Sequence, residues 1–196
     1  MLLQDKLKNK KLILGSKSPR RQAYLKDLHL DFSIQSPDVD ESYPKEFQGH
    51  NITDYIALQK ANAIKLTDIE SIAITSDTIV WHEHQALGKP SNYDEAFAML
   101  SSLSGKTHQV ITSVCIKSLD KQILFHDITE VTFINLSSED INFYIDKYQP
   151  FDKAGSYGIQ EWIGLIGISS INGSYSNVVG LPTEKLVYEL SNFLNF

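Results

Sequence analysis

The sequence lacks the features that mark secreted, membrane-spanning and nucleic-acid-binding proteins. It has a single cysteine, Cys115, so no internal disulfide can form, and its apolar surroundings predict packing in a core strand. It has no apolar run as long as a membrane span and no N-terminal secretion signal. Lys and Arg number 18 against 24 Asp and Glu, a formal net charge of −6 that argues against a general nucleic-acid binder. We therefore expect a cytoplasmic protein with no membrane or nucleic-acid partner.

Several catalytic signatures are also absent. The sequence has no P-loop, dinucleotide fingerprint, Ser-His-Asp arrangement or zinc-ligand spacing. His82 and His84 alternate as strand metal ligands would, but their polar neighbours favour solvated histidines on an exposed loop. With 196 residues, 42% of them apolar, the chain is long enough to bury a core and fits one domain over 1–196.

The stretch 12–25 predicts a buried strand, a tight polar turn and the start of a helix. Ser18 is a good N-cap and Pro19 suits the first helical position. The apolar stripe of this helix is expected at Ala23, Tyr24 and Leu28.

Arg20 and Arg21 fall in the first turn of that helix. Cations are unfavourable there, because the free N–H groups and the helix dipole already make the N-terminus positive. A bound polyanion would compensate, with Ser16, Ser18 and both guanidinium groups directed at phosphate oxygens. The alternative is a solvated turn with surface arginines. We favour the bound polyanion, because the strand, the hydroxyl pair and the double arginine occur together.

Two charged residues stand at positions that the pattern assigns to the interior. Asp77 is near the centre of an apolar strand over 71–81, where a carboxylate is costly unless it is paired or bound to a metal. Lys60 lies on the apolar stripe of a helix expected over 54–66, capped by Thr53 and carrying Ile56, Ala63 and Ile64. Its ammonium either reaches water past a packed stem or points into a cleft.

A second site-like region follows later in the chain. Gly88 and Pro90 fix the backbone around Lys89, which suits a cation held in a defined place. The loop 151–160 holds a charged pair that includes Lys153, two glycines and Gln160, whose amide can read a nucleobase edge. An ordinary glycine turn with a surface ion pair is the equally weighted alternative.

Helices and strands interleave along the chain. Further strands are expected over 31–36, 107–117, 123–134 and 166–171, the second and third as an antiparallel pair. Further helices are expected over 93–103, closed by Gly105, after Ser137 with Asp140 as a capping box, and after a cap at Thr183. The fold class is therefore α/β, a mixed sheet flanked by helices.

Six motifs together resemble the Maf family of nucleoside triphosphate pyrophosphatases, in the order of that family. They are Ser-Lys-Ser-Pro-Arg-Arg at 16–21, Ser-Asp-Thr-Ile-Val at 76–80, Gly-Lys-Pro at 88–90, Leu-Ser-Gly-Lys-Thr-His at 103–108, Asp-Lys-Ala-Gly-Ser-Tyr-Gly-Ile-Gln at 152–160 and Val-Val-Gly-Leu-Pro at 178–182. Arg20, Thr78 and Gln160 stand where the branch acting on dTTP and UTP carries the residues associated with substrate choice. Gly15, where the family often has alanine, and Glu161, where it usually has glycine, depart from the pattern. We expect the first departure to be harmless and the second to affect base preference.

The resemblance implies a two-lobed, Maf/ITPase-like fold with a central cleft, often assembled as a homodimer. It also implies Asp77 as the catalytic proton acceptor and a divalent metal, Mg²⁺ or Mn²⁺. Glu41, in an acidic turn, and Asp77 would supply hard oxygen ligands to that metal. The residues expected to bind substrate are Ser16, Arg20, Arg21, Lys60, Thr78, Lys89, Lys153 and Gln160.

The predicted reaction is hydrolysis of dTTP and UTP to the nucleoside monophosphate and pyrophosphate, a nucleotide house-cleaning activity with a link to cell division. The same fold acting on modified or other nucleotides, or a non-catalytic nucleotide-binding regulator of septum formation, are the alternatives. His108 is interpreted as structural, and Phe193 and Phe196 as core packing of the last helix.

Overall fold

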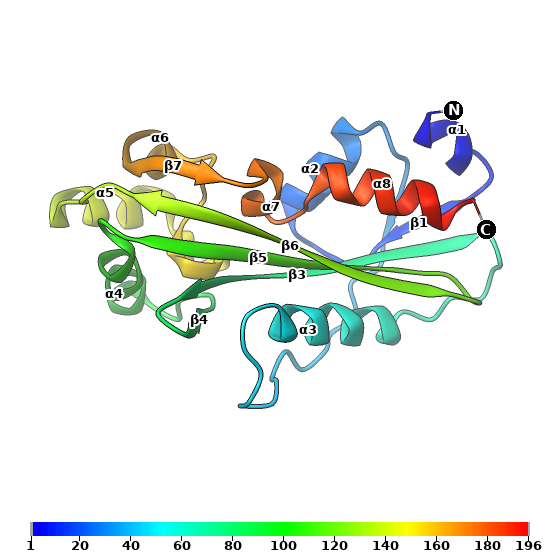
Figure 1. Ribbon diagram of the computed structural model, residues 1–196, viewed down its shortest axis with the longest axis horizontal. Coiled ribbons are helices and arrows are strands. Elements are labelled where there is room, and N and C mark those ends of the chain that lie inside the picture. Colours follow the sequence, from blue (N-terminus) through cyan, green and yellow to red (C-terminus); the bar gives the residue numbers. More distant parts are fainter. Residues whose placement is uncertain (1, 196) are drawn as a thin grey trace. The chain divides into compact units, whose positions relative to one another are not determined.

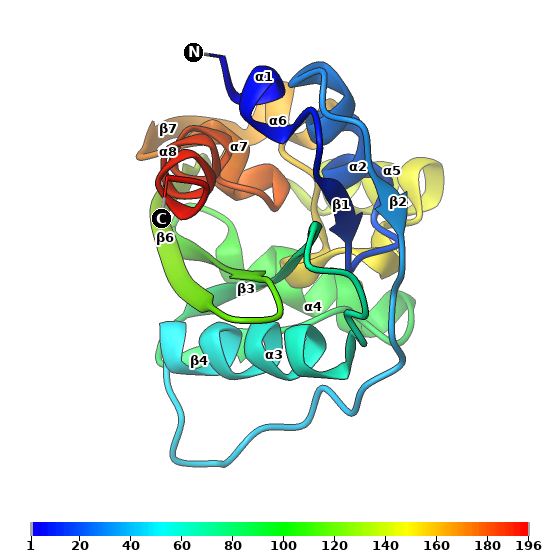
Figure 2. The same ribbon diagram turned by 90° about the vertical axis from the view of Figure 1, so that its right-hand side faces the viewer.

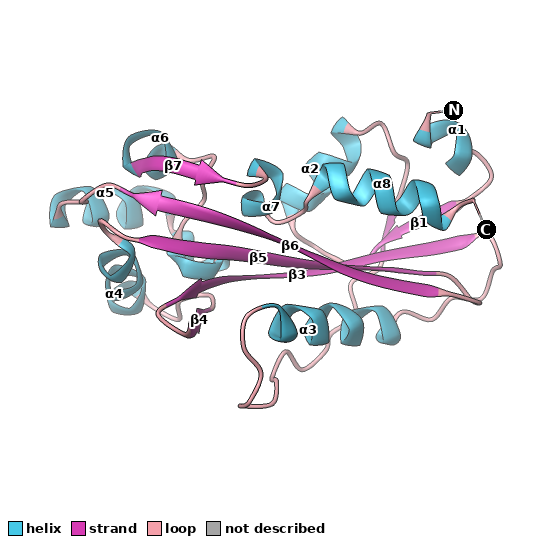
Figure 3. Ribbon diagram, viewed as in Figure 1, coloured by secondary structure: helices cyan, strands magenta, loops and turns pink. Residues whose placement is uncertain are grey.

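The computed structural model describes residues 2–195, which form a mixed β-sheet with helices against it. The strands pair in the order β2-β1-β3-β5-β6-β7, and β4 pairs with β3 outside this path. β1 is parallel to β2 and β3, whereas β4 is antiparallel to β3 and β7 to β6. This arrangement confirms the predicted fold class (Figure 3).

Residues cluster into two compact units, each built from separate stretches of chain. Unit 1 is Met1–Asp77, Thr112–Asp127 and Gly180–Phe196, and unit 2 is Thr78–Ile111 and Ile128–Val179. The strands β3 (Ser71–His82), β5 (Thr107–Lys117) and β6 (Gln122–Phe133) contribute residues to both. The two units agree with the two lobes that the resemblance implied; the single domain over 1–196, the central cleft and the homodimer stay predictions.

Unit 1 places helices on both faces of its strands. Its other elements are α1 (Leu3–Leu7), β1 (Lys11–Leu14), α2 (Pro19–Asp27), β2 (Ser33–Ile34), α3 (His50–Ala63) and α8 (Thr183–Phe193). In Figure 1, α3 lies on one face of the strands and α2 and α8 lie on the other. Figure 2 shows α1 beside α8 and the long loop between β2 and α3, which carries Glu41. The core of this unit holds the side chains of Leu12, Leu14, Leu25, Ile74, Leu186 and Leu190.

Unit 2 has its own apolar core. Its other elements are β4 (Gln85–Leu87), α4 (Tyr93–Leu103), α5 (Ser138–Tyr148), the short helical turns η1 (Pro150–Asp152) and η2 (Ala154–Ser156), α6 (Trp162–Gly167), β7 (Ile168–Asn172) and α7 (Tyr175–Val179). Its core includes Val80, Leu100, Phe133, Tyr144, Ile145 and Ile163. Glu83 and His84 join β3 to β4 in a two-residue turn in which both have positive φ, as the tightest hairpins require.

Local capping signals are confirmed where they are complete. Ser18 accepts a hydrogen bond from the Arg21 N–H, and Ser137 forms a full capping box with Asp140. The predicted bounds of α4 and β5 are those observed. Gly105 follows Ser104, the C-cap of α4, and has a φ of 69°. Cys115 is fully buried, and burial raises the pKa of its thiol to about 12.

Several predicted details are wrong. α3 begins at His50, after Gly49 with φ 54°, because the glycine turns the chain before Thr53 is reached. Thr53 is instead buried inside the helix, where its hydroxyl donates to the His50 carbonyl at 3.1 Å. The last strand begins only at Ile168, because residues 162–167 form α6. Thr183 is the first residue of α8, after Pro182 at the cap.

The predicted helix stripes are partly correct, because Tyr24 and Leu28 pack against the unit 1 core and Ile56 and Ile64 are buried. Ala23 in α2 and Ala63 in α3 are exposed instead, and the nearby buried positions are Leu25 and Ala61. Both alanines lie two residues from the buried position, which on a helix is more than half a turn away. Phe193 is buried in the unit 1 core as predicted, whereas Phe196 lies outside the described residues.

Candidate active site

The candidate site in unit 1 begins where β1 ends and α2 starts. Leu12 and Leu14 are buried in the core, which fixes the strand, and Ser18 caps the helix that follows. Ser16, in the turn between them, is only 7% exposed, and its hydroxyl oxygen accepts the Ser18 N–H at 3.2 Å. The turn is therefore held in one conformation by its own side chains.

Arg21 clamps this turn to two distant parts of unit 1. Its Nε donates to the Gly180 carbonyl at 2.9 Å, and its Nη1 donates to the Ser76 carbonyl at 3.0 Å. The same Nη1 lies 3.3 Å from the Ser16 hydroxyl oxygen. Burial lowers the pKa of Arg21, and the nearby Asp77 carboxylate opposes that change. Arg21 thus orients Ser16 and the strand residue that precedes Asp77.

Lys60 joins the two predicted metal ligands. Its Nζ lies 2.8 Å from Asp77 Oδ1 and 2.8 Å from Glu41 Oε1. The Lys60 and Asp77 side chains are only 13% and 11% exposed, whereas that of Glu41 is 50% exposed. The Lys60 side chain is therefore mostly buried, and its ammonium meets two carboxylates.

The charges in this region are mixed. Arg20, Arg21 and Lys60 are cationic, and Glu41 and Asp77 are anionic. Arg21 interacts electrostatically with Arg20, Glu41 and Asp77, which places these groups near one another. A phosphate chain would meet three cations here, while the two carboxylates would repel it unless a cation lies between them.

Glu41 and Asp77 suit a hard divalent cation. Because one oxygen of each carboxylate lies 2.8 Å from the same Lys60 nitrogen, the two carboxylates converge. Carboxylate oxygens are the ligands that Mg²⁺ and Mn²⁺ prefer, with water and phosphate completing the shell. The donor set therefore fits the predicted metal.

The remaining predicted residues belong to unit 2. Thr78 follows Asp77 on β3 and is partly buried, and Lys89 is exposed after β4. The Gly155 N–H donates to the Gly88 carbonyl at 3.0 Å, which ties the Lys89 loop to the loop of Lys153.

Glu161, the departure from the family pattern, is anchored at both oxygens. The buried Lys153 Nζ lies 3.2 Å from Glu161 Oε1 and 2.7 Å from Asp152. The Tyr144 hydroxyl donates to Glu161 Oε2 and accepts the Gly158 N–H at 3.0 Å. Burial is the main cause that raises the pKa of Tyr144, and the hydrogen bond to Glu161 is the second cause. The turn 158–161, which carries Gln160, is thus held from both ends.

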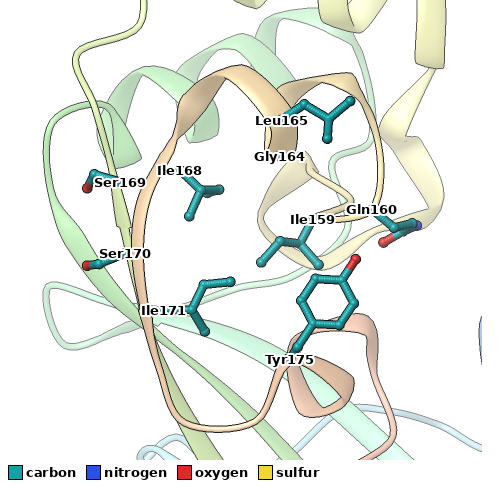
Figure 4. A pocket seen from close by; sticks show the side chains of 9 residues that line it. All are labelled: Ile159, Gln160, Gly164, Leu165, Ile168, Ser169, Ser170, Ile171 and Tyr175. Atoms are coloured by element: carbon teal, nitrogen blue, oxygen red, sulfur yellow. The ribbon is translucent and has the colours of Figure 1, made fainter.

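Gln160 borders a hollow of about 410 Å³ in unit 2. Apolar side chains of Ile159, Ile168 and Ile171 line it, together with the residues Tyr175, Ser169 and Ser170. In Figure 4, Gln160 lies at one margin of this hollow and the two serines lie at the other. The exposed amide of Gln160 is therefore available to a ligand, as a base-reading group must be.

The histidines set aside in the sequence behave differently from one another. His84 is exposed as expected, but His82 is buried as the last residue of β3, so its interpretation as a solvated loop residue is wrong. The strand continues through His82 because the turn is shorter than the polar sequence suggested. His108 is buried with its Nε2 2.7 Å from the Tyr157 hydroxyl, which supports a structural role.

Sequence reasoning missed two groups. One is the Tyr144 hydroxyl, because nothing in the local sequence marks it as a partner of Glu161. His50, Asp54 and His126 form a cluster whose one local signal is the spacing of four between the first two. Among residues 2–195, no helix is long and apolar enough to cross a membrane.

Fold and site together define a mixed α/β protein with a charged centre on a strand-turn-helix unit. The chain belongs to the Maf family: the family described as Maf-like protein matches residues 11–193. It is 55% identical over 192 residues to a dTTP/UTP pyrophosphatase of Flavobacterium psychrophilum, covering 97% of this chain and 98% of that protein. It is 52% identical over 182 residues to a dTTP/UTP pyrophosphatase of Bacteroides fragilis, covering 92% and 94%.

Solved structures share the fold at low identity. A Ham1 protein from Staphylococcus aureus matches with a TM-score of 0.54 and 14% identity, over 94% of this chain and 100% of that one. A HAM1 protein from Coxiella burnetii matches with a TM-score of 0.51 and 15% identity, over 93% and 99%. At such identities the likeness supports the α/β fold and carries no argument about chemistry.

Proposed function

We propose that this protein is a metal-dependent dTTP/UTP pyrophosphatase, which hydrolyses these nucleotides to the nucleoside monophosphate and pyrophosphate. The observation that carries the proposal is the contact of Lys60 with both Asp77 and Glu41. The relatives named dTTP/UTP pyrophosphatase, at 55% and 52% identity over nearly the whole chain, support the choice of substrate.

The reaction is attack of water at the α-phosphorus of the triphosphate. A bond forms between the water oxygen and the α-phosphorus, and the bond from that phosphorus to the bridging oxygen breaks. Pyrophosphate leaves with the electron pair of that bond. The attacking water must lose a proton, and charge builds up on the leaving phosphates.

Asp77 is proposed to accept the proton of the water. Its burial on β3 fixes the carboxylate in place, and Lys60 orients it through Oδ1. Since Lys60 holds one oxygen, Oδ2 is the oxygen left for the water. Lys60 is therefore a positioning residue for Asp77.

The leaving phosphates need positive charge. Arg20 is proposed to contact them, with the Ser16 hydroxyl and the N–H groups at the start of α2. Arg21 acts mainly through Ser16, because its Nε and Nη1 already donate to protein oxygens. Lys89 and Lys153 are proposed as further phosphate-binding residues, and for Lys153 this would break its contact with Glu161.

Glu41 and Asp77 would hold the divalent metal, Mg²⁺ or Mn²⁺. When bound, such an ion supplies charge against the phosphate oxygens and offsets the repulsion between phosphate and the two carboxylates. Gln160 and Thr78 are proposed to hydrogen-bond the uracil or thymine edge. A matched amide discriminates strongly, because a wrong base leaves buried polar groups unpaired. The cytoplasmic location stays a prediction.

The test is pyrophosphate release from eight canonical nucleoside triphosphates with Mg²⁺ or Mn²⁺. We expect turnover of dTTP and UTP, and a loss of about 10²–10⁴-fold in Asp77→Asn with nucleotide binding retained. Asp146→Asn, which removes an exposed carboxylate from the last turn of α5, is the matched control and should keep wild-type turnover. Tight nucleotide binding by the wild type without turnover would contradict the proposal and favour a regulator of septum formation.

A further inference from the structure

A second group of metal-ligating side chains lies in unit 1, away from the residues assigned to catalysis. His50 and Asp54 are four residues apart on α3, and His126 is on β6. One ligand atom from each residue lies within 4.8 Å of the others. Among residues 2–195, no other group of three His, Cys, Asp or Glu side chains is close enough to share a metal ion. Two imidazoles and one carboxylate are a common ligand set for transition metals.

The spacing of the donor atoms suits one ion. Asp54 Oδ2 lies 3.1 Å from His50 Nδ1 and 3.5 Å from His126 Nδ1. Two ligands of a tetrahedral zinc ion lie roughly 3.3 Å apart, because each Zn–N or Zn–O bond is about 2.0–2.1 Å long. The two separations, measured with the rings stacked, bracket that value.

The carboxylate is already oriented by outer partners. Ser113 Oγ donates to Asp54 Oδ1 at 2.6 Å, and the buried Thr53 hydroxyl lies 2.6 Å from Ser113 Oγ. Oδ2 is the oxygen that remains toward the histidines. His126 is fixed through its backbone, since its carbonyl accepts Lys185 Nζ at 2.7 Å. Outer hydrogen bonds of this kind orient the ligands of built metal sites.

The two imidazole rings are stacked, with centroids 4.1 Å apart and planes 13° from parallel. An ion must lie in the plane of each ring that binds it, so one ring must turn about its Cβ–Cγ bond when both bind the same ion. The side chains are 43% and 35% exposed, which leaves room for that turn. The simplest competing role is that Asp54 merely accepts hydrogen bonds from both histidines.

We propose that His50, Asp54 and His126 form a binding site for a zinc-class divalent ion, separate from the residues around Asp77. Imidazole nitrogen favours Zn²⁺, Ni²⁺ or Cu²⁺ over Mg²⁺, whereas the all-carboxylate pair of Glu41 and Asp77 favours the harder ions. The two sites therefore differ in the ion they prefer.

An ion at this site joins α3 to β6. Lys60 is ten residues further along α3 than His50, about 15 Å along the helix axis at 1.5 Å per residue. The ion would thus stabilise the helix that positions Asp77 without contacting substrate. Because binding to the folded chain alone adds stability by mass action, the melting temperature should rise with zinc concentration.

The experiment is calorimetric titration of chelator-treated protein with ZnCl₂, in the absence of nucleotide and Mg²⁺. We expect one bound zinc per chain, a higher melting temperature, and loss of both in His126→Ala and in Asp54→Asn. Ser113→Ala should weaken binding by about 10–100-fold, as outer-partner changes do. Co²⁺ substitution is a second readout, because strong visible absorption would show a four- or five-coordinate ion in the wild type, and this absorption should be lost in His126→Ala.

Two controls separate this site from the others. Asp77→Asn removes a carboxylate of the candidate active site and should leave zinc binding intact. His84→Asn removes an exposed histidine from a positive-φ position that asparagine tolerates, and should also leave it intact. Circular dichroism without metal verifies that each variant is folded. No zinc binding by the wild type, or binding lost in Asp77→Asn but kept in folded His126→Ala, would overturn the proposal while leaving the proposed function untouched.

Discussion

The ammonium of Lys60 lies 2.8 Å from the carboxylate of Asp77, although one residue is on α3 and the other is 17 positions later on β3. The contact gives a buried carboxylate its compensating charge and fixes which of its oxygens stays available. Both side chains are mostly buried, so water screens the pair weakly. Removal of Lys60 takes the ion-pair partner from a mostly buried carboxylate, which is costly.

Lys60→Met keeps most of the stem and removes the ammonium. We expect kcat/KM for dTTP to fall by about 10²–10³, the range found when one preorganised electrostatic group is lost. Lys65→Met, which alters an exposed lysine just after α3, is the control and should stay near wild type. Steady-state pyrophosphate release measures both. A change of less than about twofold in Lys60→Met would show that Asp77 needs no partner.

Tyr144→Phe removes the hydroxyl that joins Gly158 to Glu161. The Gly158 N–H then loses its buried acceptor, at a cost of about 1–3 kcal/mol in unfolding free energy. Because Gln160 lies in the same turn, the preference for dTTP over purine triphosphates should fall by roughly tenfold, equivalent to about 1.4 kcal/mol. Competition kinetics and urea unfolding report the two effects.

The control for this variant is Tyr148→Phe. The Tyr148 ring stacks on that of Tyr144, with the two ring centroids 5.1 Å apart. Its base preference should match wild type. Equal losses of preference in both variants would mean that ring packing, and not the Tyr144 hydroxyl, holds the turn.

Parts of the fold and site follow from local sequence, and parts do not. Helix capping by Ser18, and by Ser137 with Asp140, could be predicted from the sequence, because each side chain bonds a backbone N–H within three residues. The Arg21 partners Ser76 and Gly180 are 55 and 159 residues away, and no local pattern points to them.

The same reasoning applies to the charged residues. Asp77 and Lys60 stood out because each is costly among apolar positions, and their contact explains both. Glu161 was visible as a departure, but its anchors depend on how α5 packs against the turn 158–161. Burial and long-range pairing thus decide what the sequence alone leaves open.

Gly15→Ala should be destabilising, although Gly15 departs from the alanine that the family resemblance led us to expect. A Cβ on Gly15 would lie 2.5 Å from Thr75 Cγ2 and 2.8 Å from Ile64 Cδ1. Thr75 is not free to turn, because its hydroxyl donates to the Ala57 carbonyl at 2.7 Å. We expect a loss of about 1–3 kcal/mol from overpacking, seen as a lower melting temperature. Glycine here is therefore fitted to its neighbours.

Gly88→Ala is the matched control for that loss, because nothing lies within 4 Å of a Cβ at Gly88. Its melting temperature should remain within about 1 °C of wild type, since open surface positions change stability little. If Gly15→Ala is as stable as Gly88→Ala, Ile64 and Thr75 can move aside at no cost.

His108 makes stability depend on acid pH. Burial lowers its pKa from 6.5 to about 3, so between these values the unfolded chain takes up a proton that the folded chain refuses. Stability from this group is therefore complete above pH 6.5 and falls as the pH drops toward 3, by up to about 1.4 kcal/mol per pH unit.

His108→Gln removes the titrating group and keeps an amide near the Tyr157 hydroxyl. Its unfolding free energy should depend less steeply on pH between 6 and 4 than that of the wild type, as measured by urea unfolding at each pH. Parallel curves for the two proteins would assign the acid sensitivity to other groups.

The division of unit 1 into separate stretches has a consequence for how the protein is made. Leu186, Leu190 and Phe193 on α8 belong to the same core as Leu12 and Leu14 on β1. A ribosome makes β1 well before α8, so the apolar side chains of the first strand stay incompletely covered until α8 has emerged. Folding of this unit therefore waits for α8, and a nascent chain that stalls before Gly180 exposes an incomplete core to chaperones and proteases.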